Sequence, residues 1–408
     1  MSFYKNFPDK ETLLKSATAS GNEYYKVNAH LHTPFSFSAF DELQQALDMA
    51  KVEGVKVVGV NDFYSTDGYA EWAEESLKRK LFPLFNIEFI SLNKEDQANG
   101  IRVNDPNNPG RTYLSGKGLA YPLILKDPYL KQLQDVAEES NQHVAKMCAK
   151  LNEILIQIGS TFILSYDHIK KNMTSGSVRE RHLAKALRMN VELTYATAEE
   201  QMAFYEKVFG GKALKSNISD SASVENEIRG NLLKAGGGAF VPEDPKAFLE
   251  MEVVRQIILN AGGMPTYPFL ADDAKGGFTD FEEDLPKTAA ILKKRGIASV
   301  EFITTRNSVE VLEKYGEYLY NEGFVVTFGS EHNTPAMEPI TLFARNSTPL
   351  SDKLMDLNYK GACITAAHQY LVATEGKGYL DMDGKADLPS REEYVKLGRA
   401  LINYVINN

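Results

Sequence analysis

Short runs of β-forming residues that carry or lead to acidic residues and histidines recur along this chain, and they constrain its fold most. Helical patterns separate many of these runs, and such alternation is typical of a parallel sheet or barrel. In such barrels the loops that follow the strands form the active site at one rim. We therefore expect the polar residues at the strand ends to gather in one place. The runs lie at residues 24–32, 55–60, 81–89, 160–166, 298–303 and 324–328.

The first run ends at a pair of histidines that suits a metal ion. Side chains two positions apart on a strand point to the same face, so Asn28, His30 and His32 share one side. Two imidazoles about 6.5–7 Å apart along a strand can lean onto one divalent ion. Two of seven histidines can also fall two apart by chance. The later runs favour the metal interpretation, because they carry or lead to Asp62, Glu88, Asp167, His168, Glu331 and His332.

The length of the chain is compatible with one large domain. At 408 residues the chain could hold two or three domains, but (β/α) barrels often exceed 250 residues as one unit. We expect a barrel domain at residues 24–345. It follows an N-terminal segment at 1–23 and precedes a C-terminal extension at 346–408 that packs on the barrel.

Composition excludes several classes of protein. The chain is 43% apolar and 25% charged, which is ordinary for a soluble globular protein. No apolar run approaches the roughly 18 residues of a membrane span, and residues 1–21 have no signal-peptide core, so a cytoplasmic protein without a membrane partner is expected. Two cysteines argue against a disulfide framework. The net charge of −10 weighs against nucleic-acid binding. The oligomeric state stays open.

One polar segment and one helical pattern contain candidates for substrate contact. Residues 96–121 are rich in Gly, Asn and Pro, and loops of this length are usually functional or disordered. Arg111 and Lys117 could meet an anionic substrate there, although a solvated loop explains them as well. His182 lies in a helical pattern, where it could contact substrate or be satisfied by its helix neighbours.

Six segments, taken in order, resemble the PHP family, named for polymerase and histidinol phosphatase. Their order and spacing are retained from about residue 24 to about 340. The resemblance implies an α/β fold, a distorted TIM-like (β/α)7 barrel of the PHP type, here with a C-terminal helical extension. The segments are NAHLHT at 28–33 (family DLHxHT), GVND at 59–62 (ITDH), NIE at 86–88 (GIE), RHLAKAL at 181–187 (RPHxAxAL of the phosphoesterase branch), GGAFVP at 237–242 (a glycine, aromatic, valine, proline turn) and FGSEH at 328–332 (GSDxH).

The resemblance implies one complete metal site. His30, His32, Glu88 and Glu331 match the ligands of the family's first site, with glutamate in place of aspartate at position 331. Two imidazoles and two carboxylates suit zinc, iron or manganese.

The other two metal sites of the family have lost ligands in this chain. Residues 96–121 contain no histidine, and Phe269 stands where a strand histidine of the second site is expected. Phe63 follows Asp62 where the third site has a histidine, which leaves Asp62 and His332. A site with one or two ligands binds divalent ions poorly. We therefore expect one tightly held ion per chain.

These features predict a metal-dependent hydrolase, most simply a phosphoesterase acting on a small phosphorylated molecule. A metal ion would polarise the phosphoryl oxygen and lower the pKa of its water towards about 7. Asp62 or His332 would be the partner in proton transfer. Two rivals stay open. One is an enzyme of the same fold acting on a non-phosphate substrate, because fold does not fix function. The other is a non-catalytic binding protein that has lost part of its metal centre.

Overall fold

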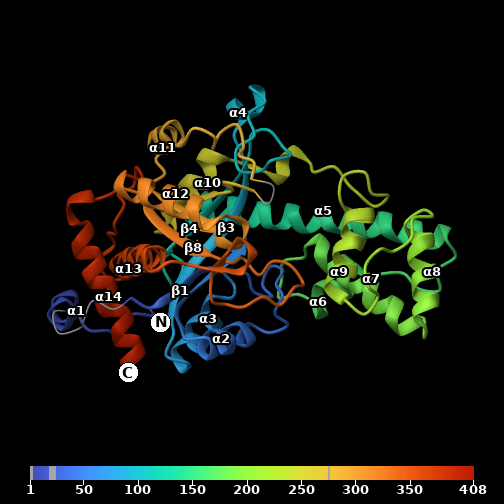
Figure 1. The fold of residues 1–408 in the computed structure, drawn as a ribbon, viewed down its shortest axis with the longest axis horizontal. Coiled ribbons are helices and arrows are strands. Elements are labelled where there is room, and N and C mark those ends of the chain that lie inside the picture. Colours follow the sequence, from blue (N-terminus) through green and yellow to red (C-terminus); the bar gives the residue numbers. More distant parts are fainter. Residues whose placement is uncertain (1–2, 18–23, 274–275) are drawn as a thin grey trace.

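The computed structural model describes residues 3–17, 24–273 and 276–408, and its centre is a nearly closed, barrel-shaped sheet of seven strands (Figure 1). Neighbouring strands follow the order β1, β2, β3, β4, β6, β7 and β8. The predicted α/β barrel with a C-terminal helical part is confirmed. The strands are β1 (Lys26–Leu31), β2 (Val55–Phe63), β3 (Phe82–Leu92), β4 (Arg111–Lys117), β6 (Met264–Phe269), β7 (Ser299–Ile303) and β8 (Val325–Gly329), while the short β5 (Leu249–Glu250) pairs with the end of β3.

Strand β4 departs from the expected parallel arrangement, because it runs antiparallel to both β3 and β6. The other neighbouring pairs on this path are parallel. The stretch at 96–121 is therefore not one long loop, since its second half contributes a barrel strand. Leu114 faces apolar neighbours while Ser115 faces the polar interior, a two-residue alternation that the expectation of a loop overlooked.

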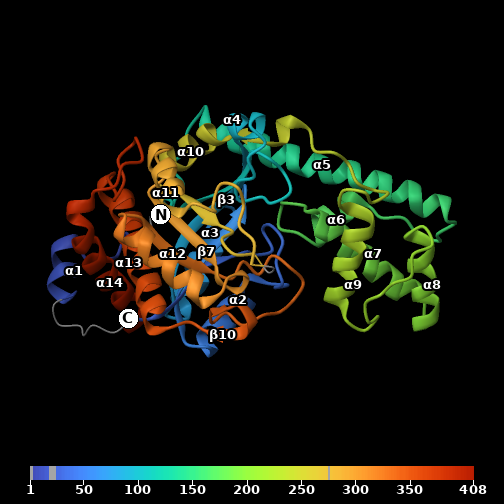
Figure 2. The ribbon, with the colours of Figure 1, turned by 45° about the horizontal axis from the view of Figure 1, so that its top comes forward.

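A helical lobe stands beside the barrel at the end of the long helix α5 (Tyr129–Gln157) (Figures 1 and 2). Residues 160–166 belong to this lobe, so the prediction of a strand there is wrong. The side chain of Asn152 bonds the backbone N–H and C=O of Leu164 and so replaces strand pairing. The lobe has its own apolar core. Its other helices are α6 (Tyr166–Asn172), α7 (Glu180–Thr194), α8 (Ala198–Val208) and α9 (Ser221–Ile228).

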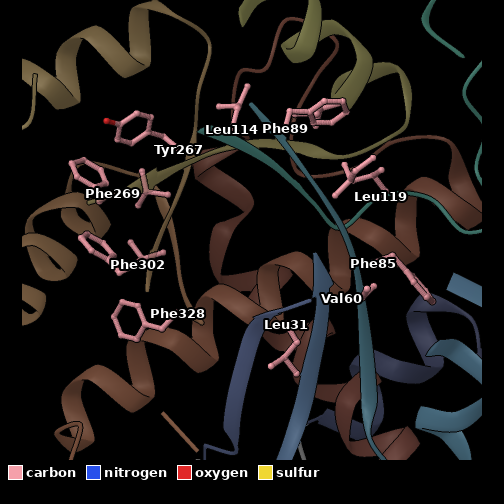
Figure 3. Close-up of a cluster of buried hydrophobic side chains, with 14 of the residues drawn as sticks. Leu31, Val60, Phe85, Phe89, Leu114, Leu119, Tyr267, Phe269, Phe302 and Phe328 are labelled. Atoms are coloured by element: carbon pink, nitrogen blue, oxygen red, sulfur yellow. The ribbon is translucent and has the colours of Figure 1, made fainter. Parts of the chain in front are cut away.

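The outer face of the barrel strands is apolar and lies under helices. Figure 3 shows Phe269 of β6, Phe302 of β7 and Phe328 of β8 in a row that runs across the three strands. Phe269 stacks on Phe302 with ring centroids 5.2 Å apart, and Phe302 meets Phe328 at 6.0 Å. The helices of this part are α2 (Leu43–Val52), α3 (Tyr69–Lys78), α4 (Lys94–Ala98), α10 (Met251–Asn260), α11 (Leu285–Lys294) and α12 (Val309–Asn321).

The inner face of the same strands is polar and buried. Hydrogen bonds cross the barrel between strands that are not neighbours, such as His30 of β1 with Glu301 of β7, and Lys117 of β4 with Asn61 of β2. Gly329 brings β8 close to β1, because a Cβ atom there would lie 2.2 Å from the Cβ of His30. The buried inward side chains include Asn28, His30, Asn61, Asn86, Glu88, Ser115, Lys117, Thr266, Ser299, Glu301 and Thr327.

The C-terminal helices α13 (Asp352–Glu375) and α14 (Arg391–Asn407) pack against the barrel on the side away from the lobe, together with α1 (Lys10–Ala17) (Figures 1 and 2). The side-chain amide of Asn358 donates to the Val27 carbonyl of β1 and accepts from the Phe328 N–H of β8. It thereby bridges the seam where these two strands meet. Within the described residues, no helix is long and apolar enough to cross a membrane.

Candidate metal centre

His30 and His32 at the end of β1 and Glu88 within β3 form a buried triad. The Nε2 atoms of the two histidines lie 3.3 Å apart. One carboxylate oxygen of Glu88, Oε2, lies 3.6 Å from Nε2 of His30 and 3.1 Å from Nε2 of His32. Three donor atoms therefore converge on one point, and this triad could hold a metal ion.

Hydrogen-bond partners at the Nδ1 atom of each histidine fix the orientation of the two rings. The Nδ1 atom of His30 lies 3.0 Å from Glu301, and the Nδ1 atom of His32 lies 3.1 Å from the Ser36 hydroxyl. A hydrogen bond at Nδ1 leaves the lone pair of Nε2 directed into the triad. Metal-binding histidines in proteins almost always have such a partner.

The donor set passes a direct test of whether a cation fits. Oε2 of Glu88 is buried and forms no hydrogen bond with any described residue, although buried carboxylate oxygens are normally bonded. Two imidazoles and one carboxylate also match the ligands of catalytic zinc sites that keep one position open. The residues present therefore fit a divalent ion.

The electrostatics of the triad favour positive charge at its centre. Burial by itself lowers the pKa of His30, but the Glu301 carboxylate more than offsets burial and raises the pKa to about 9. Burial by itself raises the pKa of Glu88, and the neighbouring rings of His30 and His32 reverse this and lower it. Both shifts reflect buried carboxylates that attract a cation.

Glu331, expected as the fourth ligand, lies beside the triad but does not join it. Its backbone carbonyl accepts a hydrogen bond from the His32 N–H at 2.8 Å, while its carboxylate pairs with Arg306. The left-handed backbone at Glu331, with φ of 67°, belongs to the sharp turn after β8. Among the described residues the converging donors are thus those of the triad alone.

The two residues expected to transfer protons occupy different positions. Asp62 is buried behind His32, where its carboxylate accepts bonds from Thr33 and Ser36 and so orders the turn after β1. Burial raises the pKa of Asp62. His332 lines the cavity described below, with Nδ1 bonded to Ser330 and Nε2 to the Glu338 carbonyl. Burial lowers the pKa of His332.

The three residues expected to contact substrate also lie in different environments. Arg111 lines the cavity, where it pairs with Glu243 and lies over the Phe248 ring. Lys117 is fully buried inside the barrel and does not line the cavity. His182 accepts a bond from the Arg179 N–H at 2.9 Å, which caps α7, and burial lowers its pKa to about 3. His182 therefore has the helix-neighbour role that the sequence left open.

A cavity of about 540 Å³ opens above the triad, between the barrel rim and the helical lobe. Glu88 is the member of the triad that lines it. Besides Arg111, its wall contains cations that the sequence did not predict, although the paired arginines around Glu180 were a usable signal. The cationic side chains in the wall are Arg111, Arg179, Arg181, Arg229, Lys234 and Arg306.

Phe63, which stands where the family resemblance placed a ligand, links the lobe to the triad. Its ring stacks on His32 with centroids 5.1 Å apart and planes 19° from parallel. The guanidinium of Arg179 lies over the same ring at 4.6 Å. Phe63 therefore connects Arg179 of the lobe with His32 of the triad.

Comparisons with solved structures support the fold. A protein from Bifidobacterium adolescentis assigned as a metal-dependent phosphoesterase aligns with a TM-score of 0.52 at 15% identity, over 81% of this chain and 94% of that one. An amidohydrolase from Chromobacterium violaceum, with bound sulfate and no metal, aligns with a TM-score of 0.51 at 14% identity, over 82% and 96%. No family profile and no curated protein matches the sequence. At these identities the likeness concerns the barrel fold.

Proposed function

We propose that this chain is a metal-dependent hydrolase, and within that class a phosphoesterase of the PHP family that acts on a small phosphorylated molecule. One observation carries the proposal. The same cavity has Glu88 of the triad in its wall and six cationic side chains around it. A divalent ion, bound at the triad, would supply Lewis-acid polarisation and a water of lowered pKa.

Two guanidinium groups without a carboxylate partner among the described residues support an anionic substrate, in a wall that also contains the acids Glu88, Asp105, Glu180, Glu331 and Glu338. Within the described residues, neither Arg179 nor Arg181 has a carboxylate ion-pair partner. Burial and the neighbouring Arg229 lower the pKa of Arg181 to about 10, as expected where like charges crowd together. Guanidinium groups bind phosphate oxygens through paired hydrogen bonds. Arg179, next to Phe63 and His32, is the best placed of them to hold the reacting phosphate.

Two residues of the chain are assigned the positioning of His32 and the transfer of protons. We propose that Asp62 positions His32 through the Ser36 hydroxyl, since its carboxylate is turned away from the cavity. His332 is the proton carrier that lines the cavity. Its Nε2 is bonded to the Glu338 carbonyl, so that contact has to open before His332 can exchange a proton with substrate.

The experiment compares purified protein with and without added zinc or manganese on a panel of phosphate monoesters, phosphodiesters and amides. The proposal expects hydrolysis of a phosphate ester that depends on metal and is lost in His32→Ala. His168→Ala is the matched control, because His168 is exposed on the lobe, away from the triad. Hydrolysis of amides alone would assign a non-phosphate substrate. Tight phosphate binding without turnover would assign a binding protein.

A further inference from the structure

Glu301 is a charged residue at the centre of the barrel that the reaction proposed above does not use. It lies on β7, is fully buried, and reaches across the interior to β1 and β4. One oxygen, Oε2, lies 3.0 Å from Nδ1 of His30 and 2.6 Å from Nζ of Lys117. The other oxygen accepts a bond from the Ser115 hydroxyl. The carboxylate is thus held from three sides.

Lys117 is equally enclosed. Its ammonium donates to the Ala29 carbonyl of β1 at 3.1 Å and to the Asn61 amide oxygen of β2 at 3.3 Å, besides Glu301. Fully buried lysines are rare, because an ammonium loses its hydration on burial. Apolar residues of similar size would fill this space with equal or greater stability. The pair therefore calls for an explanation other than packing.

We propose that Glu301 and Lys117 form a positioning pair that fixes the ring of His30, with Nδ1 bonded to Glu301 and Nε2 directed into the triad. Ala29, whose carbonyl binds Lys117, directly precedes His30, so the pair holds both the backbone and the ring of this ligand. The inference rests on the metal centre proposed above. It adds an internal anchor to a site whose other histidine is anchored by Ser36 and Asp62.

Two double variants isolate the bond to His30. Both carry Lys117→Met, which removes the buried ammonium, and they differ only in Glu301→Gln or Glu301→Leu. Glutamine keeps an oxygen that can accept the Nδ1–H bond, whereas leucine has none. Loss of an outer partner of a metal-binding histidine typically weakens metal affinity 10- to 100-fold.

The first measurement is zinc affinity by competition with a chromogenic chelator. The leucine double variant is expected to bind zinc roughly 10- to 100-fold more weakly than the glutamine double variant. Equal affinities in the two would overturn the positioning role. Asp96→Asn is the control, because it removes the buried ion pair of Asp96 with Arg295 outside the barrel interior. It should leave zinc affinity unchanged, and a comparable loss there would also overturn the role.

The second measurement needs only the unmodified chain. In nitrogen-15 spectra of histidine-labelled protein, zinc should shift Nε2 of His30 while Nδ1 stays protonated. A zinc-induced shift at Nδ1 would overturn the inference and leave the proposed hydrolase standing. If the chain binds no zinc, the proposed metal centre fails. A hydrogen-bonded Nδ1–H resonance of His30, present with glutamine at 301 and absent with leucine, would still support the positioning pair, and its persistence with leucine would overturn it.

Discussion

The two faces of the barrel strands differ in composition, although their residues alternate along the same strands. The outer face presents Leu31, Phe85 and Phe302 to the surrounding helices (Figure 3). The inner face presents His30, Glu301 and other polar side chains that bond across the interior. The outer face resembles an ordinary core, whereas the inner face carries polar residues where it approaches the triad.

This difference shows where stability and chemistry reside. Burial of apolar area stabilises a fold by about 25 cal/mol per Å², and the outer layer supplies that area. Buried polar networks add little net stability, since each bond replaces one to water. They do hold side chains in one geometry when every member is satisfied. We therefore expect substitutions on the outer face to change stability and those on the inner face to change binding and turnover.

The largest expected effect is on the inner face. His30→Ala combined with His32→Ala should reduce bound metal from about one ion per chain to nearly none, because only Glu88 of the triad remains. Loss of metal removes several kcal/mol of transition-state stabilisation, roughly a thousandfold in rate. Elemental analysis and turnover of a phosphate ester check this. Three tightly bound ions in the unmodified chain would contradict the single-ion assignment.

A substitution on the outer face should instead lower stability and leave metal binding unchanged. Phe302→Ala is expected to lower the free energy of unfolding by about 3–5 kcal/mol, because its ring is fully buried between Phe269 and Phe328. Metal bound per folded chain should not change. Urea titration and metal analysis measure both quantities.

Thr327→Val is the inner-face counterpart of Phe302→Ala. Thr327 pairs with Glu301 in the ladder, and its buried hydroxyl has no partner among the described residues. Replacing an unpartnered hydroxyl by a methyl should change stability by less than about 1 kcal/mol. A loss as large as that of Phe302→Ala would erase the distinction between the faces.

Glu282 sharpens the comparison, because it is a buried carboxyl outside the barrel interior. It accepts hydrogen bonds from Tyr267 and from the Leu270 and Ala271 N–H groups. Burial raises its pKa to about 7, above the usual value of about 4.5 for the unfolded chain. The folded state therefore binds a proton more tightly, and this contribution to stability is lost as pH rises through 7.

For the unmodified chain, Glu282 alone should reduce stability by about 2 kcal/mol between pH 5 and pH 7. Glu282→Gln should remove this decrease, since the amide does not titrate. Denaturant titrations at several pH values measure the difference between the two chains. Parallel pH profiles for both would show that Glu282 is ionised throughout.

A further expected effect concerns the cavity wall. Arg179→Ala should raise KM for a phosphate ester roughly tenfold, because a charged hydrogen bond contributes about 1.5 kcal/mol. Arg188→Ala is the control on the same helix, since Arg188 pairs with Glu192 and Glu225 instead of lining the cavity. Steady-state kinetics measure KM for both variants. Equal KM values for Arg179→Ala and Arg188→Ala would show that Arg179 does not bind substrate.

The sequence predicted the α/β barrel because the alternation of strand and helix patterns is visible locally. The four-ligand metal site stays a prediction, and the structure brings three of its residues together. Two-residue alternation identifies which side chains share a strand face, and it placed His30 and His32 together. The order of strand-end acids then placed Glu88 near them. The side chain of Glu331 escaped prediction, because its direction depends on a left-handed turn and on Arg306. Contacts that form only in three dimensions are not encoded in local spacing.

The contacts of Lys117 and Glu301 were likewise not predictable from local spacing. The sequence pattern assigns Lys117 to a polar loop, because the preceding residues are rich in Gly, Asn and Pro. Glu301 is the one charge in the apolar run at 298–303, and that isolation was a signal of an inward-facing role. Its partners come from β1 and β4, far away in the chain. The helical lobe, with its arginines, was likewise visible as helices but not as a wall of the cavity.

The Asn358 amide that bridges the barrel seam also sets the order in which the chain can be completed. Asn358 lies 331 residues after Val27, whose carbonyl it binds. During synthesis, the first strand is made long before the helix that supplies this amide, and the last strand emerges just before it. Contacts between such distant segments form late. The Asn358 contacts of this seam therefore form only when α13 has left the ribosome. A nascent chain that ends before residue 358 has every residue of the triad but lacks the amide that bridges β1 and β8.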